Sequence, residues 1–274
     1  MGVTVRKVYV LLITCASTRA VHLEVVNNMS VIDFIMALKR FCARRGYPSE
    51  IVSDNFKTFK CAAKIITSEE SQRFMTNHQI TRTFIVERAP WWGGFYERLV
   101  KSMILALKKA IGKTLLKYEE LVTLITEIEG ILNSRPLTYI SNSSPNPLTP
   151  AHFLIGYRSC ALPVSLPQSA PLTLGMRFKR KNEAVNKYWT RWRNEYLSSL
   201  REHFEQKKRT NPNLTIKVGD VVLVGDDGKK RCMWKMGRVQ EVMHGRDGCI
   251  RSAVVRTENG VMRRAVECLY PLEC

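Results

Sequence analysis

The first ninety residues contain four short apolar stretches separated by polar breaks. The stretch at 7–14 is apolar and β-branched almost throughout, which predicts a strand buried on both faces. The stretch at 20–26 alternates apolar and polar positions, which predicts a second strand with one solvated face. Shorter strands are predicted at 50–53 and 81–86.

Helices are predicted between and after these strands. Ser30 and Asp33 have the spacing of a capping box, a helical apolar stripe follows them, and Gly46 ends the helix. Two more helices are predicted at 95–111 and 118–132. Strands alternating with helices predict an α/β domain in which a mixed sheet has flanking helices.

The C-terminal third has a different pattern. Residues 176–209 predict one long helix with 11 basic and four acidic side chains and several aromatic ones. Beyond residue 216, short alternating stretches separated by Asp-Gly and Asn-Gly pairs predict a small five-stranded, all-β, SH3-like barrel. We therefore predict four parts: an α/β domain at 1–155, a linker at 156–175, a basic Trp-rich helix at 176–213, and a barrel at 214–274.

The charge indicates the kind of partner. Among 274 residues, 43 are Lys or Arg and 24 are Asp or Glu, a formal net charge of +19. The excess is +9 over residues 1–175 and +10 over residues 176–274, so it is not confined to one tail. Two folded parts that are both basic predict contact with a polyanion, and DNA is the expected partner.

Other classes of protein fit the sequence poorly. No apolar run approaches the length of a membrane span, and no signal peptide pattern is present. The eight cysteines form no C-x-x-C pair and have no histidine at zinc-finger spacing, which favours reduced thiols inside a cell. We expect an intracellular, nuclear protein that contacts no membrane and takes no small-molecule substrate.

Two carboxylates are placed where catalytic acids are found. Asp54 directly follows a predicted strand, and Glu97 lies in the first turn of a helix after a Gly-Gly loop. Two carboxylates from separate elements can converge on Mg²⁺, a hard cation used in phosphoryl transfer. Each residue also has an ordinary explanation, because Asp-Asn is a common turn and an acid in the first turn complements the helix dipole.

Basic and aromatic side chains give two further candidates, each with an alternative. Lys101 and Lys108 lie within about 40° of Glu97 around the predicted helix, which suits contacts with phosphates. The alternative is an ordinary surface pair of Glu97 with Lys101. The aromatic residues of the 176–209 helix suit core packing better than stacking on bases.

Several long segments resemble those of a known family. The segments KVYVLLITCASTRAVHLEVV, RRGYP, IVSDN, APWWGGFYERLVKSM, ILNSRPLTYI and LTPAHFLIG resemble the integrase catalytic core of BEL/Pao-type LTR retrotransposons. The later segments YWTRWRNEYLSSL, VGDVVLV, GRV, VRT and LYPL resemble the uncharacterised domain that ends those polyproteins. The resemblance covers nearly the whole chain, in order.

The resemblance implies a fold, a reaction and site residues. It implies a ribonuclease-H-like core that uses an Asp, Asp, Glu triad with two Mg²⁺ or Mn²⁺ ions to process DNA ends and join them to target DNA. The second Asp of the family matches Asp54, and its Glu matches Glu97. We assign Asn55, in the same segment as Asp54, to the DNA-binding residues together with Lys101 and Lys108. A homo-oligomer is a further expected partner.

The sequence also departs from the family. The family's first Asp lies on a strand preceding the one at Lys7, and a Gly that follows Asn55 in the family is Phe56 here. We expect Glu24 to face solvent and Asp33 to cap its helix, so neither replaces the missing acid. We therefore expect DNA binding with impaired strand transfer. The alternatives are a non-catalytic nucleic-acid-binding or assembly remnant and, less favoured, a generic metal nuclease.

Overall fold

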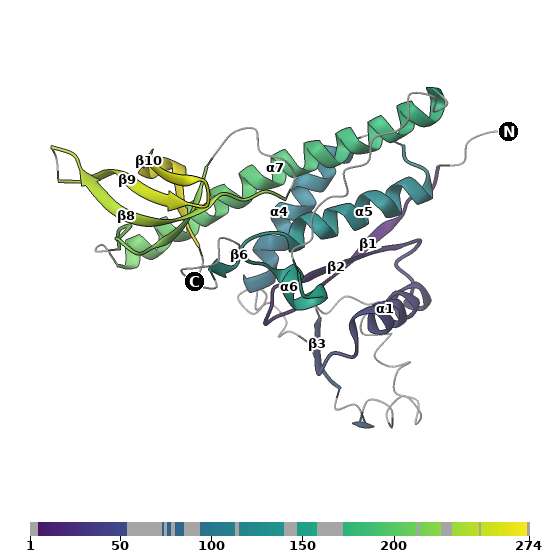
Figure 1. The fold of residues 1–274 in the computed structure, drawn as a ribbon. Helices are drawn as coiled ribbons and strands as arrows, with labels where there is room; N and C mark the ends of the chain where they lie inside the picture. Colours follow the sequence, from purple (N-terminus) through teal and green to yellow (C-terminus); the bar gives the residue numbers. More distant parts are fainter. Residues whose placement is uncertain are drawn as a thin grey trace. The chain divides into compact units, whose positions relative to one another are not determined.

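The computed structural model describes residues 5–53, 73, 76–77, 80–84, 94–112, 115–139, 147–157, 172–211, 214–225, 232–246 and 248–272 (Figure 1). The chain forms two compact units. The first contains Met1–Lys101 and Lys113–Glu129, and the second contains Ser102–Gly112 and Gly130–Cys274. The four-part division expected from the sequence stays a prediction.

The first unit contains strands of both orientations. Strands β1 (Tyr9–Thr14) and β2 (Val21–Val26) form an antiparallel hairpin. Strands β3 (Glu50–Ser53) and β4 (Thr81–Phe84) pair in parallel, although 27 residues separate them in sequence. The four strands predicted from the sequence are therefore present, and with the helices they make a mixed α/β structure. Among the described residues they form two separate two-stranded sheets, not the one mixed sheet that was expected.

The burial of the hairpin differs from expectation. Strand β1 is only half-buried along its length, whereas β2 is buried at every position before Val26. The prediction that the first strand is buried on both faces is therefore wrong. The alternating strand is the more buried one because its polar residues, His22 and Glu24, lie among charged partners instead of water.

Local sequence signals set the helix ends. Helix α1 (Val31–Arg45) begins with half of the predicted capping box, because the N-cap Ser30 accepts a hydrogen bond through Oγ from the Asp33 N–H at 3.1 Å. The Asp33 carboxylate accepts from the Ser30 hydroxyl, at 2.6 Å, and not from the Ser30 N–H as in a full capping box. Its C-terminal cap is Gly46, whose positive φ of 83° suits a residue without a Cβ. Helices α4 (Gly94–Ile111) and α5 (Tyr118–Asn133) match their predicted ranges to within one residue.

The second unit includes elements the sequence marked only weakly. Strands β5 (Thr138–Tyr139) and β6 (Pro147–Leu148) form a two-residue antiparallel pair, followed by the short helix α6 (Pro150–Ile155). Helix α7 (Leu172–Thr210) begins four residues before its predicted start and ends one after its predicted end.

Beyond α7, the described residues form a five-stranded antiparallel sheet in the order β10-β9-β8-β7-β11. A single 3₁₀ turn at Val266–Cys268 precedes the last strand. Gly260, with φ of 111°, begins the last strand of the predicted Asn-Gly hairpin. The apolar core of the sheet includes Val222, Val239 and Val255. The strands are β7 (Val221–Val224), β8 (Met236–His244), β9 (Ile250–Thr257), β10 (Gly260–Ala265) and β11 (Leu269–Pro271).

Helix α7 packs against this sheet (Figure 1), and aromatic residues make the contact. Trp234, between β7 and β8, meets three rings of the helix edge-on, with centroids 5.2 Å from Trp189, 5.8 Å from Trp192 and 5.5 Å from Tyr196. Phe204 adds its ring to the sheet core. The interpretation of the helix aromatics as packing residues is confirmed for Trp189 and Trp192, which are buried.

None of the helices in the described part of the chain combines the length and apolar character needed to cross a membrane.

Candidate nucleic-acid interface

The predicted catalytic acids lie at the edges of the described structure. Asp54 and Asn55 follow the last residue of β3 and lie outside the described residues. Glu97 falls in the first turn of α4, where the backbone is described but the side chain is not. Among the described side chains, no group of three or more His, Cys, Asp or Glu residues could hold a metal ion. Metal sharing by Asp54 and Glu97 stays a prediction.

The predicted phosphate-binding lysines are accessible. Lys101 and Lys108 both lie on α4 and are both exposed, as contact with a DNA backbone requires. Lys108 lies in the last turn of the helix, where its positive charge also complements the helix dipole.

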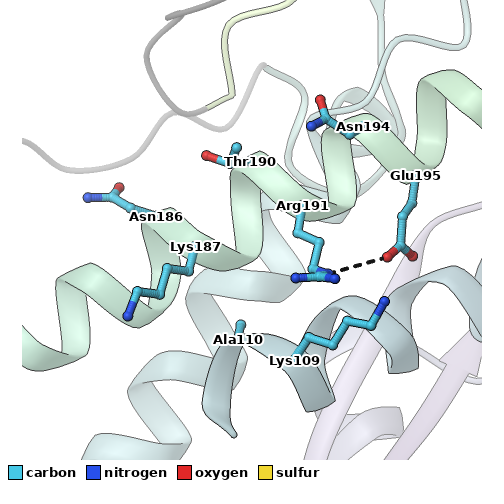
Figure 2. Close-up of a pocket in the computed structure, with 8 residues that line it drawn as sticks. All are labelled: Lys109, Ala110, Asn186, Lys187, Thr190, Arg191, Asn194 and Glu195. Carbon is cyan, nitrogen blue, oxygen red and sulfur yellow. Dashed lines mark ion pairs between the residues drawn. The ribbon is translucent and has the colours of Figure 1, made fainter.

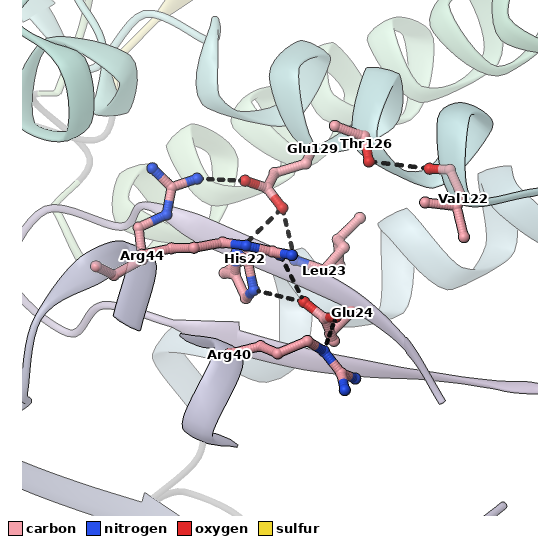
Figure 3. Close-up of polar contacts among 9 residues, drawn as sticks. His22, Leu23, Glu24, Arg40, Arg44, Val122, Thr126 and Glu129 are labelled. Atoms are coloured by element: carbon pink, nitrogen blue, oxygen red, sulfur yellow. Dashed lines mark hydrogen bonds and ion pairs between the residues drawn. The ribbon is translucent and has the colours of Figure 1, made fainter. Parts of the chain in front are cut away.

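A cluster of charged side chains forms around two buried carboxylates at β2 in the first unit (Figure 3). Glu24 is only 9% exposed, and its carboxylate accepts a hydrogen bond from Arg40 Nε at 2.5 Å and another from an Arg44 Nη at 3.0 Å. His22 Nε2 lies 3.2 Å from the same carboxylate. The expectation that Glu24 faces solvent is therefore wrong, because two arginines of α1 cover it.

A second buried carboxylate, Glu129 of α5, completes the cluster. Its oxygens accept hydrogen bonds from the Leu23 N–H at 2.8 Å and from an Arg45 Nη at 2.6 Å. His22 Nδ1 lies 3.3 Å from Glu129 Oε2, an ion-pair distance without hydrogen-bond geometry. His22 therefore lies between two carboxylates, one on its own strand and one on α5.

The protonation of Glu129 follows from these contacts. Burial by itself would raise the pKa of the carboxyl group, but His22, the Leu23 N–H and Arg45 outweigh burial and lower the pKa below its ordinary value. Glu129 is therefore ionised at neutral pH. The cluster joins β2 to α1 and α5, and its chemistry is that of a structural ion-pair network.

These contacts also bear on the two carboxylates considered as replacements for the first Asp of the resembled family. The Glu24 carboxylate is occupied by Arg40, Arg44 and His22, and Asp33 is held by Ser30 at the start of α1. Both carboxylates already have polar partners in the described part of the chain.

The second unit has a groove that the sequence did not predict, lined mainly by polar and charged residues whose apolar stems form much of its wall. The groove, called the α4–α7 groove below, has a volume of about 650 Å³ and lies between the last turn of α4 and the middle of α7 (Figure 2). The α4 side supplies Lys109 and Ala110. The α7 side supplies Asn186, Lys187, Thr190, Arg191, Asn194 and Glu195.

Charges in the α4–α7 groove are mostly positive. Lys109, Lys187 and Arg191 contribute three cations against the single carboxylate of Glu195. Arg191 Nε lies 3.7 Å from Glu195 Oε1, and Figure 2 shows both side chains extending from α7 toward α4. The sequence signal for this face was the pair Lys187 and Arg191, spaced four residues apart on a predicted helix.

Comparison with known proteins gives one family match. Residues 176–272 match a family of unknown function, DUF5641. The match covers α7 from residue 176 and the five-stranded sheet, the two elements that Trp234 packs together. No curated protein matches the chain.

Solved structures give weaker likenesses. The chain is similar to the simian T-cell lymphotropic virus intasome in complex with PP2A regulatory subunit B56 gamma, at 13% identity and a TM-score of 0.36, covering 97% of this chain and 77% of that one. It is similar to the HTLV-2 integrase catalytic core domain in complex with magnesium, at 19% identity and a TM-score of 0.36, covering 56% and 86% of the two chains. Likeness at these TM-scores does not identify the fold or the function of this chain.

Proposed function

We propose that this chain is an integrase-like, DNA-binding protein of the BEL/Pao retrotransposon type, with a ribonuclease-H-like N-terminal part. The main support for the proposal is the position of the two motif acids, Asp54 and Glu97, relative to the strands and helices. Strand β3 ends at Ser53, directly before Asp54, and α4 begins at Gly94, so that Glu97 lies in its first turn. A strand end and a helix start are the positions from which two carboxylates of an α/β site converge.

The charge distribution supports DNA as the partner. The net charge of +19 is divided between both parts of the chain, and Lys101 and Lys108 are exposed on the helix that carries Glu97. We propose phosphate contacts from these lysines and from Asn55, in a protein that acts in the nucleus as a homo-oligomer.

The C-terminal sheet is proposed to be an SH3-like barrel. Its support is the strand order β10-β9-β8-β7-β11 with a 3₁₀ turn before the last strand, and a core of short aliphatic side chains. Because α7 packs on this sheet through Trp234, we propose that the basic helix and the sheet present DNA-binding side chains from one rigid body.

Metal use follows from the donor chemistry of the motif. Asp54 and Glu97 offer the hard carboxylate oxygens that Mg²⁺ and Mn²⁺ prefer, and a bound ion would activate water or a 3′ hydroxyl for attack on a phosphodiester. In this chain the motif matches two acids, while the carboxylates of Glu24 and Asp33 are held by other side chains. We therefore propose that strand transfer by residues 1–274 is near background.

The experiment is a joining assay with purified protein, labelled DNA ends and Mn²⁺, run beside a DNA-binding assay. We expect binding by the parent and by Asp54→Asn, with joining near background in both, because the substitution removes one negative charge and no DNA contact. Robust Mn²⁺-dependent joining by the parent that Asp54→Asn abolishes would contradict the impairment. It would also mean that another residue supplies the third carboxylate.

A further inference from the structure

We infer that the α4–α7 groove binds the phosphodiester backbone of DNA, an inference that rests on the proposed DNA binding and assigns it a second contact site. The groove lies in the second unit, whereas the motif residues Asp54, Asn55 and Glu97 belong by sequence to the first. The lining side chains of the groove come from two helices, and more than seventy residues separate Ala110 of α4 from Asn186 of α7 in the sequence.

The positive charges of the groove are spaced for a strand of phosphates. Lys187 and Arg191 are one helical turn apart on α7, about 6 Å along its axis, and Lys109 approaches from α4 (Figure 2). On α7 the lining extends from Asn186 to Glu195, about 13 Å along the axis. A volume of about 650 Å³ along that length suits a run of nucleotides rather than one free phosphate ion.

Neutral donors form a second row on α7 beside the row of cations. Asn186, Thr190 and Asn194 follow one face of α7 at intervals of four residues, and all three are exposed. In Figure 2 they extend away from α4, whereas Lys187 and Arg191 extend toward it. Amide and hydroxyl groups of this kind donate hydrogen bonds to phosphate oxygens beside Arg and Lys. The cations next to α4 therefore carry the inference, and the neutral row can add contacts at the rim of the groove.

Glu195 limits the strength of the site. Its carboxylate lies 3.7 Å from Arg191, so it orients the guanidinium but also repels a phosphate. The inference therefore predicts that Glu195→Gln binds DNA more tightly than the parent, a gain that a misfolded variant would not give.

The test measures DNA affinity by fluorescence anisotropy against salt concentration for the full chain. The groove variant is Lys187→Glu with Arg191→Glu. The control is Lys179→Glu with Arg180→Glu, an equal change of charge at exposed positions of the same helix outside the groove. We expect the groove variant to lose roughly tenfold or more in affinity at 50 mM salt and to flatten the salt slope by about 2. The control should lose clearly less and keep most of its slope.

The outcomes separate the inference from the proposed function. If the parent binds no DNA at low salt, the proposed function fails and the inference fails with it. If the parent binds DNA and the groove variant behaves like its control, DNA binding stands and the groove inference is overturned. A labelled polyglutamate peptide provides a third comparison. If the peptide binds the parent but not the groove variant, while the groove variant keeps the DNA affinity of its control, the groove inference is overturned and the groove is assigned to an acidic protein partner.

Discussion

The buried carboxylate of Glu129 should stabilise the first unit against unfolding by several kcal/mol. Replacing it with Ala removes the acceptor of the Leu23 N–H and of Arg45, and removes one of the two carboxylates beside His22. Glu129 is 8% exposed and Leu23 is 5% exposed, so water does not readily replace the lost hydrogen bond.

The magnitude follows from these contacts. A buried N–H left without an acceptor costs about 1–3 kcal/mol, and a hydrogen bond to a charged group contributes about 1.5–3 kcal/mol. Breaking a buried ion pair typically costs about 3–5 kcal/mol of stability. The side chain of Arg45 is 23% exposed, so water partly replaces its lost partner and the expected cost lies near the lower end of that range. We expect Glu129→Ala to lower the free energy of unfolding by about 3 kcal/mol. Glu129→Gln should lower it by about 1–2 kcal/mol, because glutamine keeps an acceptor oxygen.

Urea unfolding followed by circular dichroism measures these differences. The control is Glu119→Ala, an exposed acid in the first turn of the same helix, with an expected cost of about 0.5 kcal/mol from the helix dipole. Because the folded-state pKa of Glu129 is lowered, its contribution is present above its unfolded-state pKa and is lost as pH falls through its folded-state pKa. Glu129→Gln should therefore lose less stability than the parent on acidification. An equal cost for Glu129→Ala and Glu119→Ala would refute the reasoning.

Three further predictions follow from the packing and the charges. Trp234→Ala should lower the free energy of unfolding by about 3–5 kcal/mol, because three rings of α7 lose their partner. Proteolysis between α7 and the sheet should become faster, and an unchanged digestion rate would contradict this prediction. Gly237→Ala should prevent a native sheet, seen as lost near-ultraviolet circular dichroism, because its Cβ would overlap Val255 and lie 2.8 Å from the Arg256 carbonyl oxygen. Reversing Lys101 and Lys108 to Glu should weaken DNA binding and flatten its salt slope, measured by anisotropy; an unchanged slope would exclude them as contacts.

Elements governed by neighbouring residues were predictable from the sequence. The capping box of Ser30 and Asp33 and the glycine at Gly46 fix the ends of α1 through contacts that span at most four residues. The Asn-Gly pair before β10 likewise sets a hairpin, because a tight turn needs the positive φ that Gly260 adopts. Helices and hairpins with such local causes were found within a few residues of their ranges.

Features created by distant residues were not predictable from spacing. The alternation at 20–26 indicated a solvated polar face, but Glu24 is covered by Arg40 and Arg44 of α1. The α4–α7 groove likewise exists only because folding brings Lys109 to the same space as Arg191. Sequence periodicity identifies the face on which a residue lies but not what covers that face. Asp54 and Glu97, by contrast, were singled out by their places after a predicted strand and in the first turn of a predicted helix, and the resemblance implied their roles. The structure confirms that β3 ends directly before Asp54 and that Glu97 lies in the first turn of α4.

The salt dependence of DNA binding shows whether this basic chain binds DNA through its phosphates. The parent chain is titrated with labelled duplexes of unrelated sequence between 50 and 200 mM salt. If about six phosphates are neutralised, affinity should fall roughly 10³-fold over that range and differ little between sequences. No detectable binding at 50 mM salt, or binding that salt leaves unchanged, would contradict the account of this basic chain as a DNA-binding protein.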